Sequence, residues 1–239
     1  DGLNLCFETR EGILKHCSLK VARHMESIEP GGVGSRFMEG RQASLEAQLC
    51  NLADEIAYNA HDVDDGVRSG LISIEQLHEV PLFRRFHDQA LADHAGLGEG
   101  APRRLLAEVL RRMLSAQVHD VIGHSRSLLE QHRPAGAHDA TLCPPLIAFS
   151  PGMRQASTDL KRFLFARLYR HPQVVGTTRR GQEVVRDLFA AYATRPSEMP
   201  AEFARRVDLH RAVCDYIAGM TDRFALREHE RLTGRRLFD

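Results

Sequence analysis

The sequence predicts an all-α protein built as a bundle of many helices, and three observations support this class. Apolar residues recur at helical spacing through most of the 239 residues, whereas the strict alternation of apolar and polar residues that marks a half-buried strand is almost absent. Leu and Ala, which favour helices, fill the apolar positions, and aromatic residues make up only 6%. With 43% hydrophobic residues, the chain is able to bury a sizeable core.

The first half of the chain is expected to contain one long helix and several short ones. Ser44 is a good N-cap for a helix that continues to about Gly66, with apolar residues on one side. Residues 18–42 are expected to be irregular because a cluster of Pro and Gly interrupts them. The other elements expected here are helices over 3–17, 74–78 and 81–95 and a glycine-rich linker over 96–100.

The second half is expected to open with another long helix, because Pro102 suits a first helical turn and the periodic pattern continues to about His132. The buried stripe predicted for this helix consists of Leu106, Val109, Leu110, Met113, Leu114, Val118 and Val121. Beyond it we expect a loop over 135–152 and then helices over 153–170, 178–194, 201–207 and 208–233. We place a boundary between two domains, 1–134 and 135–239.

Charge and cysteine content exclude several classes of protein. Lys and Arg (32) balance Asp and Glu (32), which argues against a dedicated nucleic-acid binder. No stretch approaches the ~18 apolar residues of a membrane span, so no membrane partner is expected. The five Cys are odd in number and form no C-x-x-C pair, which excludes a zinc ribbon and favours a reduced, cytoplasmic protein.

Three side chains on the Ser44–Gly66 helix are candidates for a ligand site. Asp54, Tyr58 and Asp62 are spaced i, i+4, i+8, which places them on one stripe of the helix about 80° wide and about 12 Å long. One carboxylate suits a hard divalent cation, and the phenol and second carboxylate suit a sugar or phosphate. The alternative is a solvated acidic face, with Tyr58 as a partly buried core phenol.

The order of the amino acids in this helix is also informative. Leu-Ala-Asp-Glu-Ile-Ala-Tyr-Asn-Ala-His-Asp-Val-Asp-Asp-Gly, residues 52–66, resembles the late metal-ligand motif of the deoxyguanosine triphosphate triphosphohydrolases, a family of HD-domain phosphohydrolases. Further stretches resemble the same family in order along the chain: Gly2-Leu-Asn-Leu with Glu11–His16, Leu160–Leu164 with Tyr169–His171, and Asp215–Arg223.

The resemblance implies a fold and a reaction. It implies a multi-helix HD-domain-like bundle that lacks its N-terminal helices, with 1–134 as the C-terminal part of the HD core and 135–239 as a helical subdomain packed on it. It implies hydrolysis of deoxynucleoside triphosphates, dGTP or related, to deoxynucleoside and triphosphate. The implied cofactor is a divalent cation such as Mg or Mn, and the implied assembly is a homo-oligomer under effector control.

The resemblance also implies roles for single residues. Asp54 would be the last protein ligand of the metal, and Tyr58 would contact the sugar or phosphates. Asp62 would hold the sugar 3′-hydroxyl, and Lys15 would reach a phosphate. Arg112 is a further candidate for the same pocket, from the long helix that begins at Pro102.

The family's other ligands, a lone His and a His-Asp pair, precede this helix in the family and have no match here, so no catalytic residue is assigned. We expect them in a preceding segment, and we expect little hydrolase activity from this chain alone; a triphosphohydrolase assay with added metal tests that. The chain contains four other His-Asp dipeptides, which we interpret as surface or capping histidines: His61-Asp62, His87-Asp88, His119-Asp120 and His138-Asp139.

Two other classes of function stay open at the level of sequence. One is a non-catalytic regulatory module that binds nucleotides or single-stranded DNA through its arginine pairs, although each pair is more simply a solvated helix face. The pairs are Arg84-Arg85, Arg103-Arg104, Arg111-Arg112, Arg179-Arg180, Arg205-Arg206 and Arg235-Arg236. The other is a helical oligomerisation domain that uses the apolar stripe of 102–132.

Overall fold

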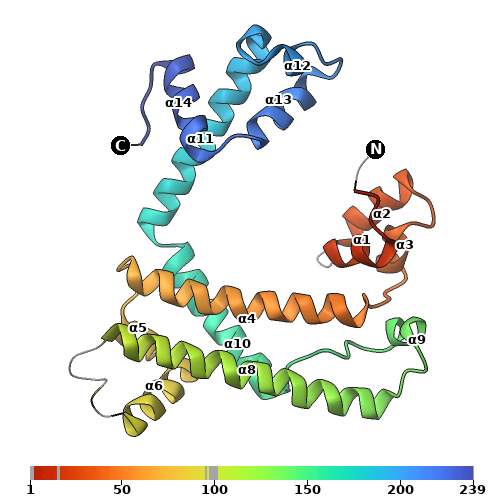
Figure 1. The fold of residues 1–239 in the computed structure, drawn as a ribbon, viewed down its shortest axis with the longest axis vertical. Helices are drawn as coiled ribbons and strands as arrows, with labels where there is room; N and C mark the ends of the chain where they lie inside the picture. Colours follow the sequence, from red (N-terminus) through yellow and green to blue (C-terminus); the bar gives the residue numbers. More distant parts are fainter. Residues whose placement is uncertain (1–2, 15–16, 95, 97–101, 239) are drawn as a thin grey trace. The chain divides into compact units, whose positions relative to one another are not determined.

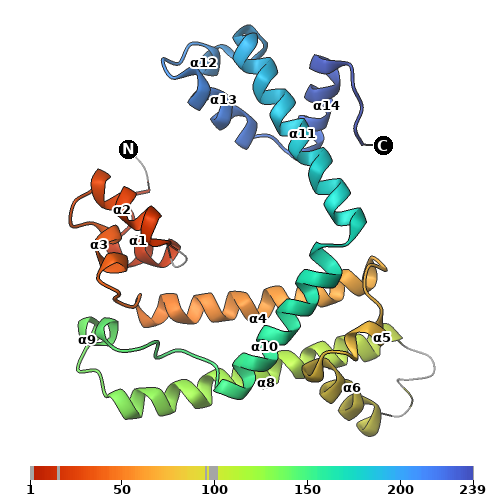
Figure 2. The same ribbon diagram turned by 180° about the vertical axis from the view of Figure 1, so that it is seen from behind.

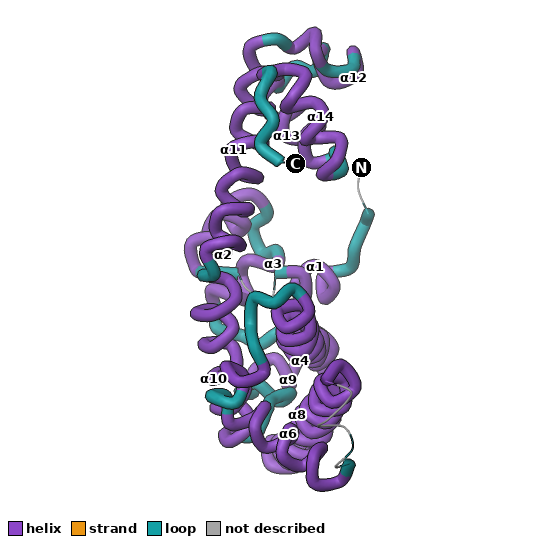
Figure 3. Tube along the Cα trace, turned by 90° about the vertical axis from the view of Figure 1, so that its left-hand side faces the viewer, coloured by secondary structure: helices purple, strands orange, loops and turns teal. Residues whose placement is uncertain are grey.

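The protein is described here by a computed structural model, which covers residues 3–14, 17–94, 96 and 102–238. Over these residues the regular structure is helical throughout, and none of them forms a strand (Figure 3). The all-α prediction is therefore confirmed. None of the helices found in these ranges has a stretch long and apolar enough to cross a lipid bilayer. The chain divides into two compact units, Asp1–Leu168 and Tyr169–Asp239.

Two long helices, α4 (Leu45–Arg68) and α8 (Pro102–His132), lie side by side at the centre of the first unit (Figure 1). As predicted, Ser44 caps α4, because its hydroxyl accepts a hydrogen bond from the Ala47 N–H at 3.2 Å. The two helices bury a shared apolar cluster of Leu52, Ile56, Val121 and Phe149. This cluster fixes which side of α4 faces the core.

Shorter helices complete the first unit. α6 (Pro81–Asp93) packs on α8, and α10 (Pro151–Leu164) packs on both α4 and α6. Figure 2 shows α10 crossing the two long helices. The boundary expected between 134 and 135 falls inside this unit, because Phe149, from the segment before α10, is part of the core cluster with α4. α5 (Ile74–Leu77) precedes α6, and both match their predicted positions.

The prediction of irregular chain over 18–42 is wrong. The structure forms α2 (Leu19–Ile28) and α3 (Val33–Met38) there. Ser18 caps α2 by accepting from the Val21 N–H at 3.3 Å. The glycines serve the helix pair: Gly31 turns the chain at φ +76°, and Gly34 lies so close to α2 that a Cβ would be 2.6 Å from the Ala22 carbonyl oxygen. The helix expected over 3–17 is shorter, α1 (Phe7–Ile13).

Three later predictions also need correction. The expected loop over 135–152 contains the short helix α9 (Ala137–Leu142). The helix expected over 208–233 is two helices, α13 (Leu209–Ala218) and α14 (Asp222–Thr233), because Gly219 ends the first and the Thr221 hydroxyl caps the second. α11 (Pro172–Thr194) begins six residues earlier than expected, with Pro172 in its first turn.

The buried stripe predicted for α8 is partly wrong. Val109 and Met113 are buried, but Leu114 is 41% exposed and Val118 is 37% exposed. A row of residues spaced by four drifts about 40° around the helix at each step, so the row through Leu114 and Val118 turns away from the core. With Ile122, which is 54% exposed, these residues form an exposed apolar row on α8.

The second unit has its own core. α11 packs against α13 and α14, with a 3₁₀ turn (Pro196–Glu198) and α12 (Ala201–Ala204) between them. Tyr192 is fully buried here, and its hydroxyl donates to Glu228 Oε2 at 2.7 Å. The buried residues of this core are Val184, Leu188, Tyr192, Met199 and Val213.

A partly buried carboxylate joins α4 to α10 in the first unit. Glu55 accepts hydrogen bonds from Ser157 at 2.9 Å and Arg154 at 3.1 Å, and Lys161 Nζ lies 2.8 Å from its Oε2. Burial raises the pKa of Glu55, but the hydrogen bonds from Lys161 and Ser157 and the two positive charges outweigh it. The net pKa is below the ordinary value of 4.5.

This lowered pKa predicts a pH-dependent contribution to stability. The ionised Glu55 stabilises the contact of α4 with α10 above the ordinary pKa of 4.5, and the contribution is lost as the pH falls below it. Because Arg154 and Lys161 are each 45% exposed, we expect Glu55→Gln to cost about 1 kcal/mol at pH 7. Hydrogen exchange of the α10 amides should then be roughly fivefold faster than in wild type. An equal difference between variant and wild type at pH 7 and pH 3.5 would contradict the assignment.

Candidate functional site

The candidate stripe lies on the side of α4 that points away from the core. The buried residues of α4 are Leu52, Ile56, Asn59, Val63 and Gly66. At 100° per residue, the centre of this buried row is about 120° around the helix from Tyr58, the middle residue of the stripe. The three candidate side chains are therefore presented together on a surface that the helix pair leaves open.

The exposed fraction of the Tyr58 side chain decides whether it is a partly buried core phenol or a residue available to a ligand. Asp54 is exposed, Asp62 is half-buried, and Tyr58 is 56% exposed. A partly buried core phenol is therefore not what the structure contains. An exposed aromatic ring between two carboxylates is suited to stack on, or hydrogen-bond to, a polar ligand.

α1 lies against the same face of α4, further toward its N-terminus. Gly12 of α1 is so close that an added Cβ would lie 3.2 Å from the Ala47 Cβ. Ala47 precedes Asp54 by seven residues, which is two helical turns, so both residues share one side of α4. α1 therefore ends near the start of the stripe. Lys15, the predicted phosphate contact two residues beyond α1, lies outside the described residues.

The structure adds two cations that the sequence analysis missed. Glu55, which binds Arg154 and Lys161 of α10, precedes Asp62 by seven residues and so lies on the same side of α4. Two positive charges against one carboxylate place a cationic group beside the acidic stripe, and such a group suits the phosphates of a ligand. The signal was in the sequence: Arg154, Ser157 and Lys161 are spaced i, i+3, i+7, which is one face of α10.

Arg112 is held elsewhere. Its Nη1 donates to Asp93 of α6 at 2.6 Å, and its Nε donates to Glu108 at 2.6 Å. Glu108 also pairs with Arg111, and hydrogen bonds from Arg111 and Arg112 lower the pKa of Glu108 to about 2. The structure thus places Arg112 in an ion-pair network between α6 and α8, and its charge is compensated by two carboxylates. It does not join the stripe on α4.

The described residues do not complete a metal site around Asp54. Asp62 is about 12 Å further along the helix and cannot share an ion with it. Within the described ranges, one group of three His, Cys, Asp or Glu side chains brings its ligand atoms within 4.8 Å of one another: His78, His87 and Asp88. Divalent ions need several ligands, so Asp54 fits the role of a single carboxylate ligand and no more.

One of the four His-Asp dipeptides was misread. His61, His119 and His138 are exposed, as expected for surface histidines. His87, by contrast, is buried in α6, with 8% of its surface exposed. Its ring stacks on Phe83 and meets the His78 ring edge-on, with centroids 4.3 Å apart. The interpretation of His87 as a surface or capping residue is therefore wrong.

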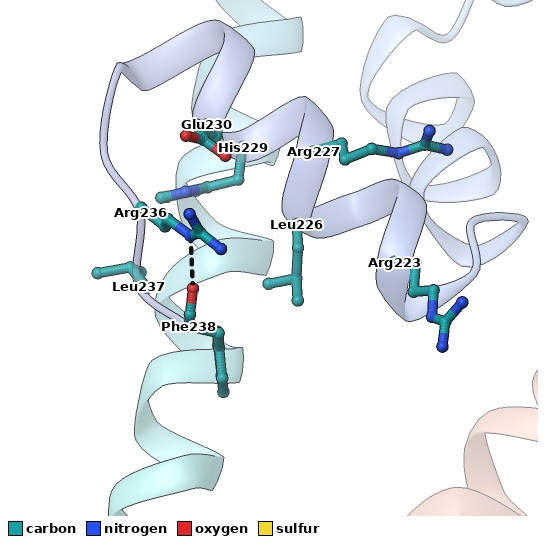
Figure 4. Close-up of a pocket in the computed structure, with 8 residues that line it drawn as sticks. All are labelled: Arg223, Leu226, Arg227, His229, Glu230, Arg236, Leu237 and Phe238. Carbon is teal, nitrogen blue, oxygen red and sulfur yellow. Dashed lines mark hydrogen bonds between the residues drawn. The ribbon is translucent and has the colours of Figure 1, made fainter.

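Two hollows of the described surface have room for a ligand, one at α4 and one in the second unit. One of about 400 Å³ touches α4 at Asp64 and Arg68, but Asp64 lies about 120° around the helix from Tyr58, the middle residue of the stripe, and so lies off it. The other, of about 470 Å³, lies in the second unit beside α14 (Figure 4). Figure 4 shows Arg236 on one side of it and Arg223 and Arg227 directed the other way, so the three arginines do not converge on one anion.

In three of the six arginine pairs, carboxylates compensate the charge of at least one arginine. Arg111 binds Glu108, Arg206 binds Asp215, and Arg235 binds both Glu183 and Asp187. Carboxylates that compensate arginines compete with the phosphates of a nucleic acid. This compensation weakens the single-stranded-DNA-binding alternative at those three pairs, and the alternative stays a prediction.

Comparison with known proteins shows what the chain is similar to. A family model described as the phosphohydrolase-associated domain matches residues 147–231. A deoxyguanosinetriphosphate triphosphohydrolase-like protein of Bordetella pertussis is 50% identical to the chain over 234 residues, which is 97% of this chain and 59% of that protein. Over nearly its whole length the chain is similar to deoxyguanosinetriphosphate triphosphohydrolase-like proteins. The resemblance seen in the sequence is thereby confirmed.

Other triphosphohydrolase-like proteins match in the same way. The protein of Ralstonia nicotianae is 47% identical over 97% of this chain and 58% of its own length, and that of Nitrosomonas europaea is 42% identical over 97% and 60%. The chain thus spans about three fifths of the length of the curated relatives it matches. The matched domain, 147–231, includes Arg154, Ser157 and Lys161.

Proposed function

We propose that this chain supplies the nucleotide-facing part of a site for metal-dependent hydrolysis of deoxynucleoside triphosphates, dGTP or related, to deoxynucleoside and triphosphate. The observation that carries the proposal is the stripe of Asp54, Tyr58 and Asp62 on the open side of α4, with Arg154 and Lys161 beside it. The relatives' printed name, deoxyguanosinetriphosphate triphosphohydrolase-like protein, supports the substrate class.

Each residue of the stripe has a separate role in the proposal. Asp54 would supply one carboxylate ligand to a divalent ion such as Mg or Mn, with the other ligands coming from the rest of a protein of the relatives' length. When bound, that ion supplies a water of lowered pKa. The water oxygen would bond to the α-phosphorus while the bond from phosphorus to the sugar 5′-oxygen breaks, which releases deoxynucleoside and triphosphate.

The remaining groups would bind the substrate. Asp62, eight residues beyond Asp54, would accept a hydrogen bond from the sugar 3′-hydroxyl, and Tyr58 would contact the sugar or phosphates between them. Arg154, Lys161 and Lys15 would offset the charge of the triphosphate as it develops in the transition state. Arg112 has no substrate role in this scheme, since Asp93 and Glu108 already bind it.

A hybrid protein tests the proposal. This chain would replace the matching segment of the Bordetella pertussis relative, and the hybrid would be assayed for release of triphosphate from each deoxynucleoside triphosphate with Mg or Mn. We expect turnover that needs the metal, and the chain alone as the low-activity comparison. Full turnover by a hybrid whose Asp54, Tyr58 and Asp62 are all replaced by alanine would overturn the proposal.

Asp62 should control affinity for the sugar. In the hybrid, Asp62→Ala is expected to raise KM for deoxynucleoside triphosphates roughly tenfold, because a hydrogen bond to a charged group contributes about 1.5 kcal/mol. Steady-state kinetics measure this. Asp64→Ala, two residues on and on the other side of α4, is the control that should leave KM unchanged. An unchanged KM for Asp62→Ala would remove Asp62 from the pocket.

The proposal includes a homo-oligomer. The exposed apolar row of Leu114, Val118 and Ile122 on α8 supports it, since these side chains are 37–54% exposed in the single chain. A cytoplasmic location is part of the same proposal. The five cysteines are free thiols, which suits a reducing compartment.

A further inference from the structure

Outside the α4 stripe, two histidines meet at the junction of α5 and α6, one half-buried (His78) and one buried (His87). His78 follows the last residue of α5, and His87 lies in α6, two turns after its start at Pro81. Phe83 packs against both rings, with centroids 6.0 Å from His78 and 5.8 Å from His87. The two imidazoles are therefore held together by a tightly packed helix junction.

His87 has an unmet hydrogen-bonding requirement. Its Nδ1 is buried and makes no hydrogen bond within the described part of the chain. The nearest carboxylate oxygen, Asp88 Oδ1, lies 3.6 Å away, which is too far for a hydrogen bond. Buried polar atoms nearly always make a hydrogen bond or bind a metal ion, so a partner is expected for His87 Nδ1.

We propose that His78, His87 and Asp88 form a binding site for a divalent transition-metal ion, separate from the site on α4. One ligand atom from each of the three residues lies within 4.8 Å of the others. Ligands of one zinc ion at bond lengths of about 2.0–2.1 Å lie roughly 3.3 Å apart, close to the 3.6 Å between His87 Nδ1 and Asp88 Oδ1. A small rotation of the half-buried His78 ring and the exposed Asp88 side chain would bring all three ligand atoms, which lie within 4.8 Å of one another, to this spacing.

The ligand types define the kind of ion. Two imidazoles and one carboxylate suit Zn²⁺, Co²⁺ or Ni²⁺, whereas Mg²⁺ and Ca²⁺ favour oxygen ligands. Three protein ligands leave further positions to water. The ion would give His87 Nδ1 its missing partner and would link the end of α5 to the second turn of α6.

Cobalt binding tests the site directly. The metal-free chain would be titrated with Co²⁺, and the visible absorption of the bound ion would give both affinity and ligand type. We expect a nitrogen-containing Co²⁺ site whose dissociation constant rises at least tenfold in His78→Gln and in Asp88→Asn. Asp88 is 66% exposed, so its replacement should leave the fold intact, and circular dichroism checks this.

Two controls separate this site from other histidines and from the proposed catalytic metal. His119→Gln changes an exposed His of another His-Asp dipeptide, and Asp54→Asn removes the ligand proposed on α4. Both should bind Co²⁺ as tightly as wild type does. Unchanged binding in His78→Gln and Asp88→Asn, or loss of binding in Asp54→Asn, would overturn the inference; the latter would leave the proposal for α4 intact.

Discussion

Asp54→Asn is expected to lower triphosphohydrolase turnover of the hybrid protein by roughly a hundredfold or more. Loss of a residue that merely supports a metal ligand costs 10- to 100-fold, and loss of a ligand carboxylate should cost at least the upper figure. The substitution keeps the size of the side chain, and Asp54 is exposed, so the fold should be unaffected. Turnover and bound metal, the latter by elemental analysis, are measured on the same preparation.

Asp64→Asn is the matched control for this prediction. It makes the same chemical change on the same helix but off the stripe, about 120° around the helix from Tyr58, where Asp64 pairs with Arg68 across one turn. That exposed pair contributes little to stability, so turnover and metal content should stay at wild-type levels. If Asp54→Asn retains wild-type metal stoichiometry and turnover, Asp54 is not a metal ligand.

The second large effect is expected from the smallest substitution, Gly34→Ala in α3. The added Cβ would lie 2.6 Å from the Ala22 carbonyl oxygen and 3.0 Å from the Glu26 amide nitrogen, both backbone atoms of α2 that cannot move aside alone. The two helices must separate, at a cost of roughly 1–3 kcal/mol. Hydrogen exchange of the α2 and α3 amides should accelerate by roughly five- to 150-fold.

A glycine-to-alanine substitution in α8 should instead raise the free energy of unfolding. A Cβ at Gly123 would meet nothing within 4 Å, so Gly123→Ala adds helix propensity without a clash and should stabilise α8 by about 1 kcal/mol. Exchange of the α8 amides should slow. Destabilisation by both substitutions, or by neither, would show that close packing of α3 on α2 is not what requires Gly34.

Local signals predicted the long helices well. Ser44 and Pro102 mark the starts of α4 and α8, and their apolar periodicity is long enough to define each helix. The same rules give the wrong prediction at α2 and α3, because they treat Gly31 and Gly34 as helix breakers, whereas Gly31 turns the chain and Gly34 allows the two helices to approach. Whether a glycine interrupts a helix or allows a neighbour to approach depends on tertiary packing, which periodicity does not contain.

In the candidate site, too, local sequence predicts some features and tertiary packing determines the others. The stripe of Asp54, Tyr58 and Asp62 follows from helical spacing alone. The pairing of Glu55 with Lys161 and Arg154 joins residues about a hundred positions apart, so no local pattern predicts it. The burial of His87 was missed because it depends on how the helices pack: the His78 ring, which follows α5, meets the His87 ring edge-on, and α6 packs on α8.

The boundary between the two compact units has a consequence for how the chain can be divided. The phosphohydrolase-associated domain match begins at residue 147, but the first compact unit ends at Leu168. The matched segment therefore begins inside the first unit and does not coincide with the second. A fragment cut to the matched range would separate Arg154 and Lys161 from Glu55 and expose the apolar side of α10. A fragment that begins at Tyr169 instead keeps the core around Leu188 and Tyr192 whole, and is the better choice for isolating the second unit.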